Sequence, residues 1–202
     1  MGRRNEHTRE QQREMAIAAA ELILVRDGFA GLSMRKVADA IGYTVGNLYL
    51  LFQNQDDLLA TINERTTDAI YGHLRDAAAT VSQPLPRLRA VAAAYIDFAQ
   101  QHSQRFRMMF EHQLPPEMKP RPSTEVRIQR MFELVESCLA PLMPKGNPQR
   151  LRLSAATLWS GVHGVCMLAV TGKLHWSGRQ DYRPFCDHLI NTFIAGLPAA
   201  RR

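Results

Sequence analysis

The sequence predicts an all-α fold of about nine helices. Apolar residues recur at helical spacing along the whole chain, between the Gly and Pro residues that interrupt the pattern. No stretch shows the sustained alternation of apolar and polar residues, bounded by hairpin turns, that predicts strands. A chain of 202 residues can also bury a sizeable core without disulfides. We therefore expect a small N-terminal domain, residues 1–55, and a larger helical domain, residues 56–202.

Three helices are predicted in the first domain. The first spans about residues 8–27, ends at an Asp-Gly pair, and places Met15, Ala19, Leu22 and Ile23 on one face. Ser33 is a good N-cap for a short helix over 34–41, in which the apolar residues Met34, Val37, Ala38 and Ile41 share one face. Thr44 caps a third helix over 45–51.

A long fourth helix begins after Asn54, with two aspartates in its first turn. Negative side chains there suit the positive end of the helix dipole. Proline and glycine residues separate the remaining helical stretches, which are predicted at residues 84–101, 103–112, 123–142, 149–173 and 180–196. The fourth helix is the natural connector between the two domains.

The two short helices and the Gly42-Tyr43-Thr44 turn between them have the lengths and spacing of a helix-turn-helix. In that motif the second short helix presents its exposed face to a major groove about 12 Å wide. The run GFAGLSMRKVADAIGYTVGNLYLLFQNQDDLL, residues 28–59, resembles the signature of the TetR family of regulators. This resemblance implies a homodimer that binds double-stranded DNA.

The resemblance further implies that the exposed side of the third helix faces base edges, with Thr44 and Tyr49 near phosphates. The Asn47 amide can donate and accept at adenine, and apolar side chains can touch thymine methyls. Alternatively, Val45 and Leu50 are core residues of a structural helical triplet. The candidate DNA-binding residues are Arg3, Arg4, Ser33, Arg35, Thr44, Val45, Gly46, Asn47, Tyr49, Leu50 and Gln55.

This chain departs from the family pattern at two positions. The family commonly has Lys where this chain has Gln55, and often a polar or basic residue where it has Val45. Basic residues elsewhere can compensate, including an N-terminal arm with Arg3 and Arg4, unless these belong to a disordered tail. The formal charge of +6 does not locate the DNA-binding part, because residues 1–55 contain seven basic and six acidic residues.

The last two helices are expected to form the dimer. Family members pair these helices with their copies in a four-helix bundle, and two-fold symmetry would match a palindromic operator. A glycine inside a helix costs about 1 kcal/mol relative to alanine, so glycines here favour a close helix approach. The candidate interface residues are Gly161, Val165, Phe185, Leu189, Ile190 and Phe193.

A small-molecule pocket is implied by the family and by the run Trp159-Ser-Gly-Val-His163-Gly164. This run is similar to the Trp/His-Gly element of one C-terminal subgroup (WHG-type). Alternatively, Trp159 and His163 share a helical face inside an ordinary core. The candidate ligand-binding residues are Tyr95, Phe98, Phe106, Met109, Phe110, Met131, Phe132, Trp159 and His163, for an apolar or anionic effector.

We expect no enzymatic activity, cofactor or metal site, because no catalytic, phosphate-binding or metal-binding motif is present. The three cysteines lack metal spacing, and no signal peptide or uninterrupted apolar run of about 18 residues occurs. A soluble, cytoplasmic protein is expected, and the resemblance to the TetR family implies a bacterial one. The predicted function is a transcriptional regulator, a repressor released by a small molecule. The alternative is a DNA-binding dimer controlled by a protein partner, or acting architecturally, with no small-molecule effector.

Overall fold

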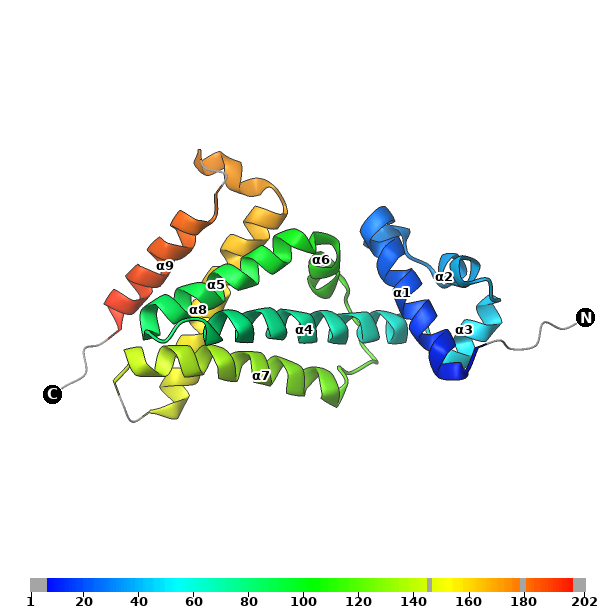
Figure 1. The fold of residues 1–202 in the computed structure, drawn as a ribbon, viewed down its shortest axis with the longest axis horizontal. Helices are drawn as coiled ribbons and strands as arrows, with labels where there is room; N and C mark the ends of the chain where they lie inside the picture. The colour runs from blue at the N-terminus through cyan, green and yellow to red at the C-terminus, as the bar shows by residue number, and fades with distance from the viewer. Residues whose placement is uncertain (1–6, 145–146, 179–180, 198–202) are drawn as a thin grey trace, which may run out of the picture. The chain divides into compact units, whose positions relative to one another are not determined.

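A computed structural model describes residues 7–144, 147–178 and 181–197. Within these ranges the regular structure is helical, and nine α-helices follow one another along the chain (Figure 1). The predicted fold class is therefore confirmed. The α-helices are α1 (Arg9–Asp27), α2 (Met34–Ile41), α3 (Val45–Leu51), α4 (Gln55–Ala79), α5 (Pro84–Gln101), α6 (Ser103–Glu111), α7 (Pro122–Leu139), α8 (Pro148–Val170) and α9 (Arg183–Gly196).

Local sequence explains several helix ends. Thr8 forms a capping box with Gln11 at the start of α1, and Ser33 accepts a hydrogen bond from the backbone N–H of Lys36 at the start of α2. Gly42 ends α2 with φ at 73°, a left-handed conformation that glycine adopts without steric cost. Three 3-10 helices, at Phe29–Gly31, Ala140–Leu142 and Lys173–Ser177, complete the described elements. Two predicted helix ends are thus shortened, at residues 139 and 170.

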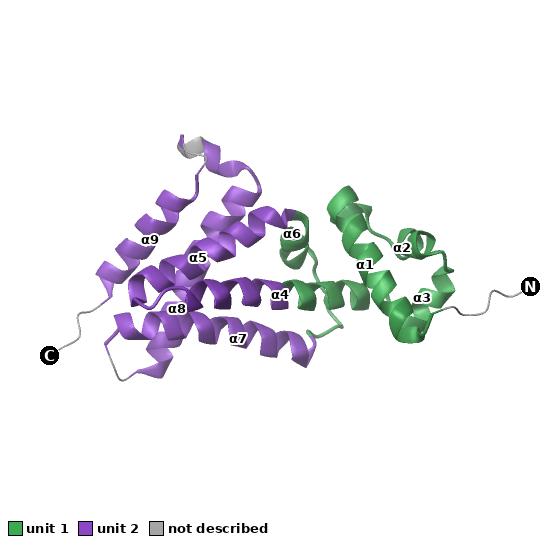
Figure 2. Ribbon diagram, viewed as in Figure 1, with its two compact units in different colours: residues 1–66, 104–120 green, residues 67–103, 121–202 purple. Residues whose placement is uncertain are grey.

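The chain divides into two compact units, coloured separately in Figure 2. Unit 1 comprises Met1–Thr66 and Gln104–Pro120, and unit 2 comprises Thr67–Ser103 and Arg121–Arg202. These units differ from the sequence-based boundary at residue 55, because α6 and the following loop group with the N-terminal helices. The functional boundary itself stays a prediction.

Unit 1 has one buried apolar cluster. Helices α1, α2 and α3 pack against one another around it, and the fully buried Met108 of α6 belongs to it as well. The His112 Nε2 atom, just after α6, lies 2.9 Å from the Asp56 carboxylate of α4. These contacts explain why a segment distant in sequence belongs to this unit.

The four apolar residues that the sequence places on one face of α1 differ in burial. The buried residues of this helix are Gln12, Ala16, Ile17, Ala20, Ile23 and Leu24. Of the four, Ile23 is buried, Ala19 packs half-buried against the core, and Leu22 is 72% exposed. Two alanines and a glutamine make up half of the buried set, so the positions of the larger apolar residues alone do not locate the core face of this helix.

Unit 2 is built from long helices. Helix α5 packs against α7, α8 and α9, and α8 also packs against α7 and α9. Polar contacts join α5 to the beginning and middle of α9: the Tyr182 hydroxyl donates to Asp97, and Arg89 donates to Asn191 at 2.6 Å. Apolar packing thus holds this unit, with a polar seam between α5 and α9.

Helix α8 is long and apolar enough, by length and composition, to cross a membrane. The sequence expectation considered only uninterrupted apolar runs, and Arg150, Arg152 and His163 interrupt this helix. Within the chain, 22% of the apolar window of α8 is buried. The other residues of this window are half-buried or exposed within the chain.

Candidate functional site

Helix α3 is short, and contacts at both ends hold it. Thr44 caps its N-terminus by accepting a hydrogen bond from the Asn47 backbone N–H at 3.3 Å. At its C-terminus, Arg9 donates to the Leu50 carbonyl at 2.5 Å and Arg13 donates to the Leu51 carbonyl at 2.7 Å. Terminal carbonyls of a helix otherwise lack partners, so two guanidinium groups of α1 stabilise this end of α3.

The outward face of α3 is apolar and accessible. Tyr49 is 54% exposed and Leu50 is 67% exposed, while Thr44 and Gly46 are also on the surface. Val45 instead packs, half-buried, against the unit 1 core. The core alternative therefore applies to Val45, and Leu50 remains free to contact a partner.

Asn47 is held by a residue that the sequence analysis did not identify. Its Nδ2 donates to Gln12 Oε1 at 3.3 Å, and Gln12 Nε2 donates to the His7 carbonyl at 3.0 Å. Gln12 is only 6% exposed. A polar residue on the buried face of an amphipathic helix is the sequence signal that could have found it.

The other predicted DNA-binding residues have different environments. The Ser33 hydroxyl is occupied as the cap of α2, Arg35 is exposed, and Gln55 begins α4 half-buried. Arg3 and Arg4 lie outside the described residues. Within the described part of unit 1, the structure thus keeps Arg35 as an accessible cation near the motif.

Several basic side chains of unit 1 are already paired. Arg26 lies 2.7 Å and Lys36 lies 3.3 Å from the Asp27 carboxylate. The hydrogen bond from Arg26 holds the pKa of Asp27 well below its usual value, with Lys36 adding to the effect. These two cations at the C-terminal end of α1 and the start of α2 are therefore engaged within the protein.

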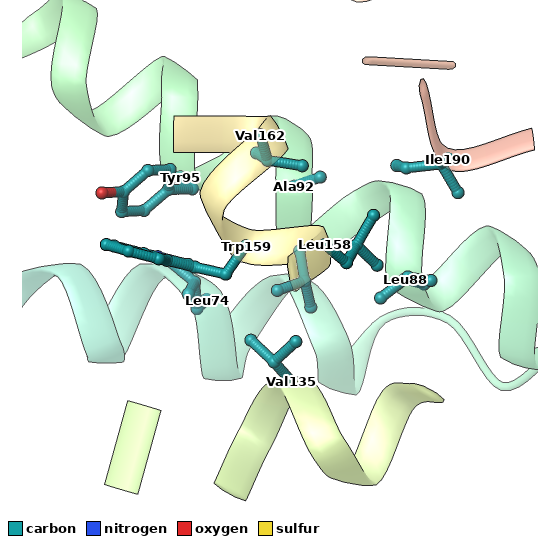
Figure 3. Close-up of a pocket in the computed structure, with 10 residues that line it drawn as sticks. Leu74, Leu88, Ala92, Tyr95, Val135, Leu158, Trp159, Val162 and Ile190 are labelled. Atoms are coloured by element: carbon teal, nitrogen blue, oxygen red, sulfur yellow. The ribbon is translucent and has the colours of Figure 1, made fainter. Parts of the chain in front are cut away.

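Unit 2 contains an apolar cavity, shown in Figure 3. Its volume is about 30 Å³, room for about one water molecule, whereas ligand pockets usually measure about 300–1,000 Å³. The lining residues come from α4, α5, α7, α8 and α9: Leu74, Leu88, Val91, Ala92, Tyr95, Val135, Leu158, Trp159, Val162 and Ile190. A drug-sized molecule can therefore enter only if these helices rearrange.

Two of the predicted ligand residues line this cavity, Tyr95 and Trp159. Most of the wall is aliphatic and was not predicted, although Leu88, Val91 and Ala92 share a helical face with Tyr95. That shared face is the sequence signal for the α5 wall. The sequence-based candidates were aromatic residues and methionines, whereas mainly aliphatic side chains surround the cavity.

His163 lies beside this wall in a small aromatic cluster. Its Nδ1 is 3.0 Å from the Tyr95 hydroxyl, and its ring stacks on Trp159 at a centroid distance of 4.9 Å. Burial lowers the pKa of His163 and raises that of Tyr95. Both groups are therefore uncharged at neutral pH, and the cluster offers hydrogen bonds rather than charge.

The remaining predicted ligand residues do not line the cavity. Phe132 contacts Trp159 edge-on at 5.5 Å, Met131 is half-buried on α7, and Phe98 packs against the ring of His102 at 4.6 Å. Phe106, Met109 and Phe110 belong to α6 in unit 1, where Phe106 is fully buried beside Phe110. Helical spacing does not tell which unit a short helix joins, and the assignment of these three residues to a ligand site stays a prediction.

A surface groove of about 610 Å³ lies along α8 and α9. It is lined by Gly161, Val165, Pro184, Phe185, His188, Leu189 and Thr192, which include four of the predicted dimer residues. Ile190 is instead 1% exposed and lines the unit 2 cavity, so its assignment to the dimer surface is corrected. Phe193 is half-buried on α9.

The two glycines of α8 have different environments. A Cβ on Gly161 would lie 2.8 Å from Leu189 Cδ2, so this glycine permits the close packing of α9 within the chain. A Cβ on Gly164 would meet nothing within 4 Å. Since a glycine inside a helix costs about 1 kcal/mol, no packing within the described chain accounts for Gly164.

A capped short helix with an exposed face, preceded by a second short helix and a turn, defines unit 1 as a helix-turn-helix of the DNA-binding class. Two family models agree with this assignment. The model described as "Bacterial regulatory proteins, tetR family" matches residues 16–62, and "Tetracyclin repressor-like, C-terminal domain" matches residues 88–193. The chain belongs to the TetR family of DNA-binding transcriptional regulators.

Known proteins resemble the chain in sequence and fold. The HTH-type transcriptional activator FasR of Mycolicibacterium smegmatis is 29% identical over 137 residues, which span 66% of this chain and 63% of FasR. The structure of a protein with unknown function from Rhodococcus sp. RHA1 matches with a TM-score of 0.77 at 22% identity. The match covers 97% of this chain and 99% of that chain. FadR of Bacillus subtilis, solved with stearoyl-CoA, has a TM-score of 0.67 at 14% identity, covering 92% and 99%. These structures share the fold.

Proposed function

We propose that this protein is a homodimeric, sequence-specific regulator whose affinity for an operator is controlled by an apolar small molecule. The observation that supports it most directly is α3, a helix of seven residues held from both ends with Tyr49 and Leu50 exposed. Such a helix fits a groove that accepts about two helical turns.

The groove on α8 and α9 supports dimerisation. The apolar residues that line this groove and a glycine with open space around it both suit the close approach of a second copy. Two copies related by a two-fold axis would bind the two halves of a palindromic operator. Gly164 would then lie where the backbones of the two α8 helices come close.

The unit 2 cavity supports an apolar effector. Its wall contains no charged side chain among the residues that line it, so a buried ionised group would find no counterion there. The stearoyl-CoA complex of FadR suggests that the inserted part is an acyl chain. Since the cavity is small, ligand binding would favour a more open arrangement of α4, α5, α7 and α8, and that difference in affinity is what couples the effector to DNA.

The sign of regulation is proposed to be repression that the effector relieves. FasR is named an activator, so the same fold serves either outcome, and the position of the operator relative to the promoter would decide between them. An operator is first selected from a randomised duplex library. A reporter placed under this operator is then measured in cells with and without the gene for this regulator. Higher expression in the presence of the regulator would contradict repression.

DNA binding is tested with Asn47→Ala. We expect specific operator binding to weaken by about 1–3 kcal/mol while nonspecific binding barely changes, because a base contact is lost and phosphate contacts remain. Equilibrium binding to the selected operator and to a scrambled duplex at one salt concentration measures both. An equal loss on the two duplexes would contradict the assignment of Asn47 to base contacts.

Dimerisation is tested with Gly164→Glu, which introduces a charge where a Cβ meets nothing within the chain. We expect the dimer to dissociate at least roughly tenfold more readily, because an unpaired carboxylate would be buried between the copies. The matched control is Gly72→Glu on α4, another glycine with nothing within 4 Å. Sedimentation equilibrium of both variants measures this, and an intact Gly164→Glu dimer would exclude the proposed surface.

The effector is tested by thermal unfolding with a panel of long-chain acyl-CoA thioesters, fatty acids and uncharged alkanols. Ligand at roughly a hundredfold excess over Kd stabilises a fold by about 2.7 kcal/mol, or about 5–10 °C for a chain of this size. A rise in melting temperature with concurrent loss of operator binding supports the proposal. Without any such rise, control by a protein partner or an architectural role becomes the better account.

A further inference from the structure

A chain of hydrogen bonds leads from the backbone of His7 to the exposed edge of α3. Gln12 is its central member, with its Nε2 donating to the His7 carbonyl at 3.0 Å and its Oε1 accepting from Asn47 Nδ2 at 3.3 Å. His7 is itself held, since its Nδ1 lies 3.1 Å from the Tyr43 hydroxyl at the turn between α2 and α3. Gln12 is buried, so water does not compete freely for these contacts.

The donors and acceptors of these hydrogen bonds follow one another in a fixed direction. The two ends of an amide side chain differ chemically, because the oxygen only accepts and the nitrogen only donates hydrogen bonds. A backbone carbonyl also only accepts, so the end of Gln12 that faces His7 must be its NH₂ group. The other end is then the oxygen, and the part of Asn47 that faces it must be its NH₂ group.

The oxygen of Asn47 is consequently directed away from Gln12. Among the described residues, no hydrogen bond is donated to this oxygen. Asn47 is half-buried, and it lines a surface hollow of about 300 Å³ together with His7, Arg9, Gln12, Leu50 and Leu51. The side chain of Asn47 is therefore accessible from this hollow, and its oxygen is an acceptor that no described residue uses.

We infer that Gln12 is a positioning residue that makes Asn47 present its carbonyl oxygen to DNA, so that the protein selects adenine or cytosine at one operator position. Only these two bases carry an exocyclic amino donor in the major groove, whereas guanine O6 and thymine O4 would oppose oxygen to oxygen. The inference rests on the proposed function and adds the base class that α3 selects.

The competing explanation is that Gln12 merely satisfies its own buried polar groups. That role would affect folding and the binding of every sequence alike. A positioning role has a different consequence, because it changes the preference at one base pair and leaves the others unchanged. The base preference at each position is therefore the measurement that separates the two explanations.

The experiment selects bound duplexes from a randomised double-stranded library with the full-length wild type, four single variants and one double variant. Asn47→Ala identifies the operator position that depends on Asn47. Gln12→Met has similar length but no polar end, and Gln12→Glu keeps an acceptor for the Asn47 NH₂ group. Gln100→Met, at an exposed glutamine of α5, is the matched control for the loss of a polar side chain.

We expect the wild type to favour adenine or cytosine about tenfold at the Asn47-dependent position, and Gln12→Met to retain only about a twofold preference there. Gln12→Glu should keep the preference while binding all sequences more weakly, since its charge repels phosphate and it no longer donates to the His7 carbonyl. Gln100→Met should match the wild type. The double variant Gln12→Met with Asn47→Ala should lose no more preference than Asn47→Ala alone.

Three results would overturn the inference. One is a preference for guanine or thymine at the Asn47-dependent position, and another is an unchanged preference in Gln12→Met. The third is an equal decline at all positions in Gln12→Met, which would indicate a structural role. If the wild type selects no sequence at all, the proposed function fails first, and that outcome is distinct from the other three.

Discussion

Helices α3 and α8 are stabilised by different kinds of contact. Helix α3 buries one side chain, Leu48, and is otherwise held by polar contacts from α1. Helix α8 buries four side chains and depends on apolar packing around the unit 2 cavity. Hydrogen bonds are directional and define an orientation, whereas apolar packing is non-directional and can rearrange. The difference suits a helix that must present fixed groups and a helix that must accommodate a ligand.

The largest effect is expected for Leu48→Ala, which tests whether polar contacts alone can hold α3. Leu48 is fully buried in a tightly packed cluster, so its truncation should lower the free energy of unfolding by about 2–5 kcal/mol. Urea denaturation measures this loss. A change below about 1 kcal/mol would mean that the polar contacts suffice without the apolar anchor.

The second effect concerns the polar contacts themselves. The Arg13 guanidinium donates to the Leu51 carbonyl and lies 4.4 Å from the centroid of the Phe52 ring. Arg13→Met should cost about 1–2 kcal/mol of stability, because it removes a charge-assisted hydrogen bond and a cation–π contact. The exposed Arg35 provides the control, since Arg35→Met should change stability by less than about 0.5 kcal/mol. An equal loss of stability in the two variants would mean that the contacts of Arg13 with the end of α3 do not stabilise the protein.

A third prediction tests whether water is excluded from the Cys166 thiol in unit 2. Burial, with a contribution from Cys186, raises the pKa of the Cys166 thiol to about 12. The unfolded thiol ionises at its lower ordinary pKa, so this stabilisation is complete below that value and is lost as pH rises toward about 12. By pH 10 the wild type should have lost about 1 kcal/mol more than Cys166→Ala, measured by urea denaturation across pH. Parallel pH profiles would mean that water reaches this thiol.

The smallest effect is expected from filling the cavity with Val135→Ile. One added methylene fits a space of about 30 Å³ and should stabilise the fold by about 0.5–1 kcal/mol. The same change should reduce the rise in melting temperature produced by an effector. Val126→Ile, at a 66% exposed valine on the same helix, is the matched control. If Val135→Ile destabilises the fold and Val126→Ile does not, the cavity has no room for an added methylene.

Much of the helical arrangement was predictable from sequence because helix limits depend on local chemistry. Thr8, Ser33 and Thr44 cap helices, and Gly42 provides a left-handed turn, whatever the distant chain does. Those features, with the apolar spacing from Gly28 to Leu59, also predicted the helix-turn-helix. The position of Ile190 was not predictable, because α9 has apolar residues on both its inner and outer faces.

The sequence by itself determined the order of helices, the helix-turn-helix and the family, since all three follow from residues close together in the chain. Only the tertiary structure decided that α6 joins unit 1, that Val45 faces inward, and that a buried glutamine orients Asn47. It also decided that aliphatic side chains surround the cavity and that Gly164 faces open space. These outcomes depend on contacts between residues far apart in sequence, where periodicity specifies a face but not the partner that covers it.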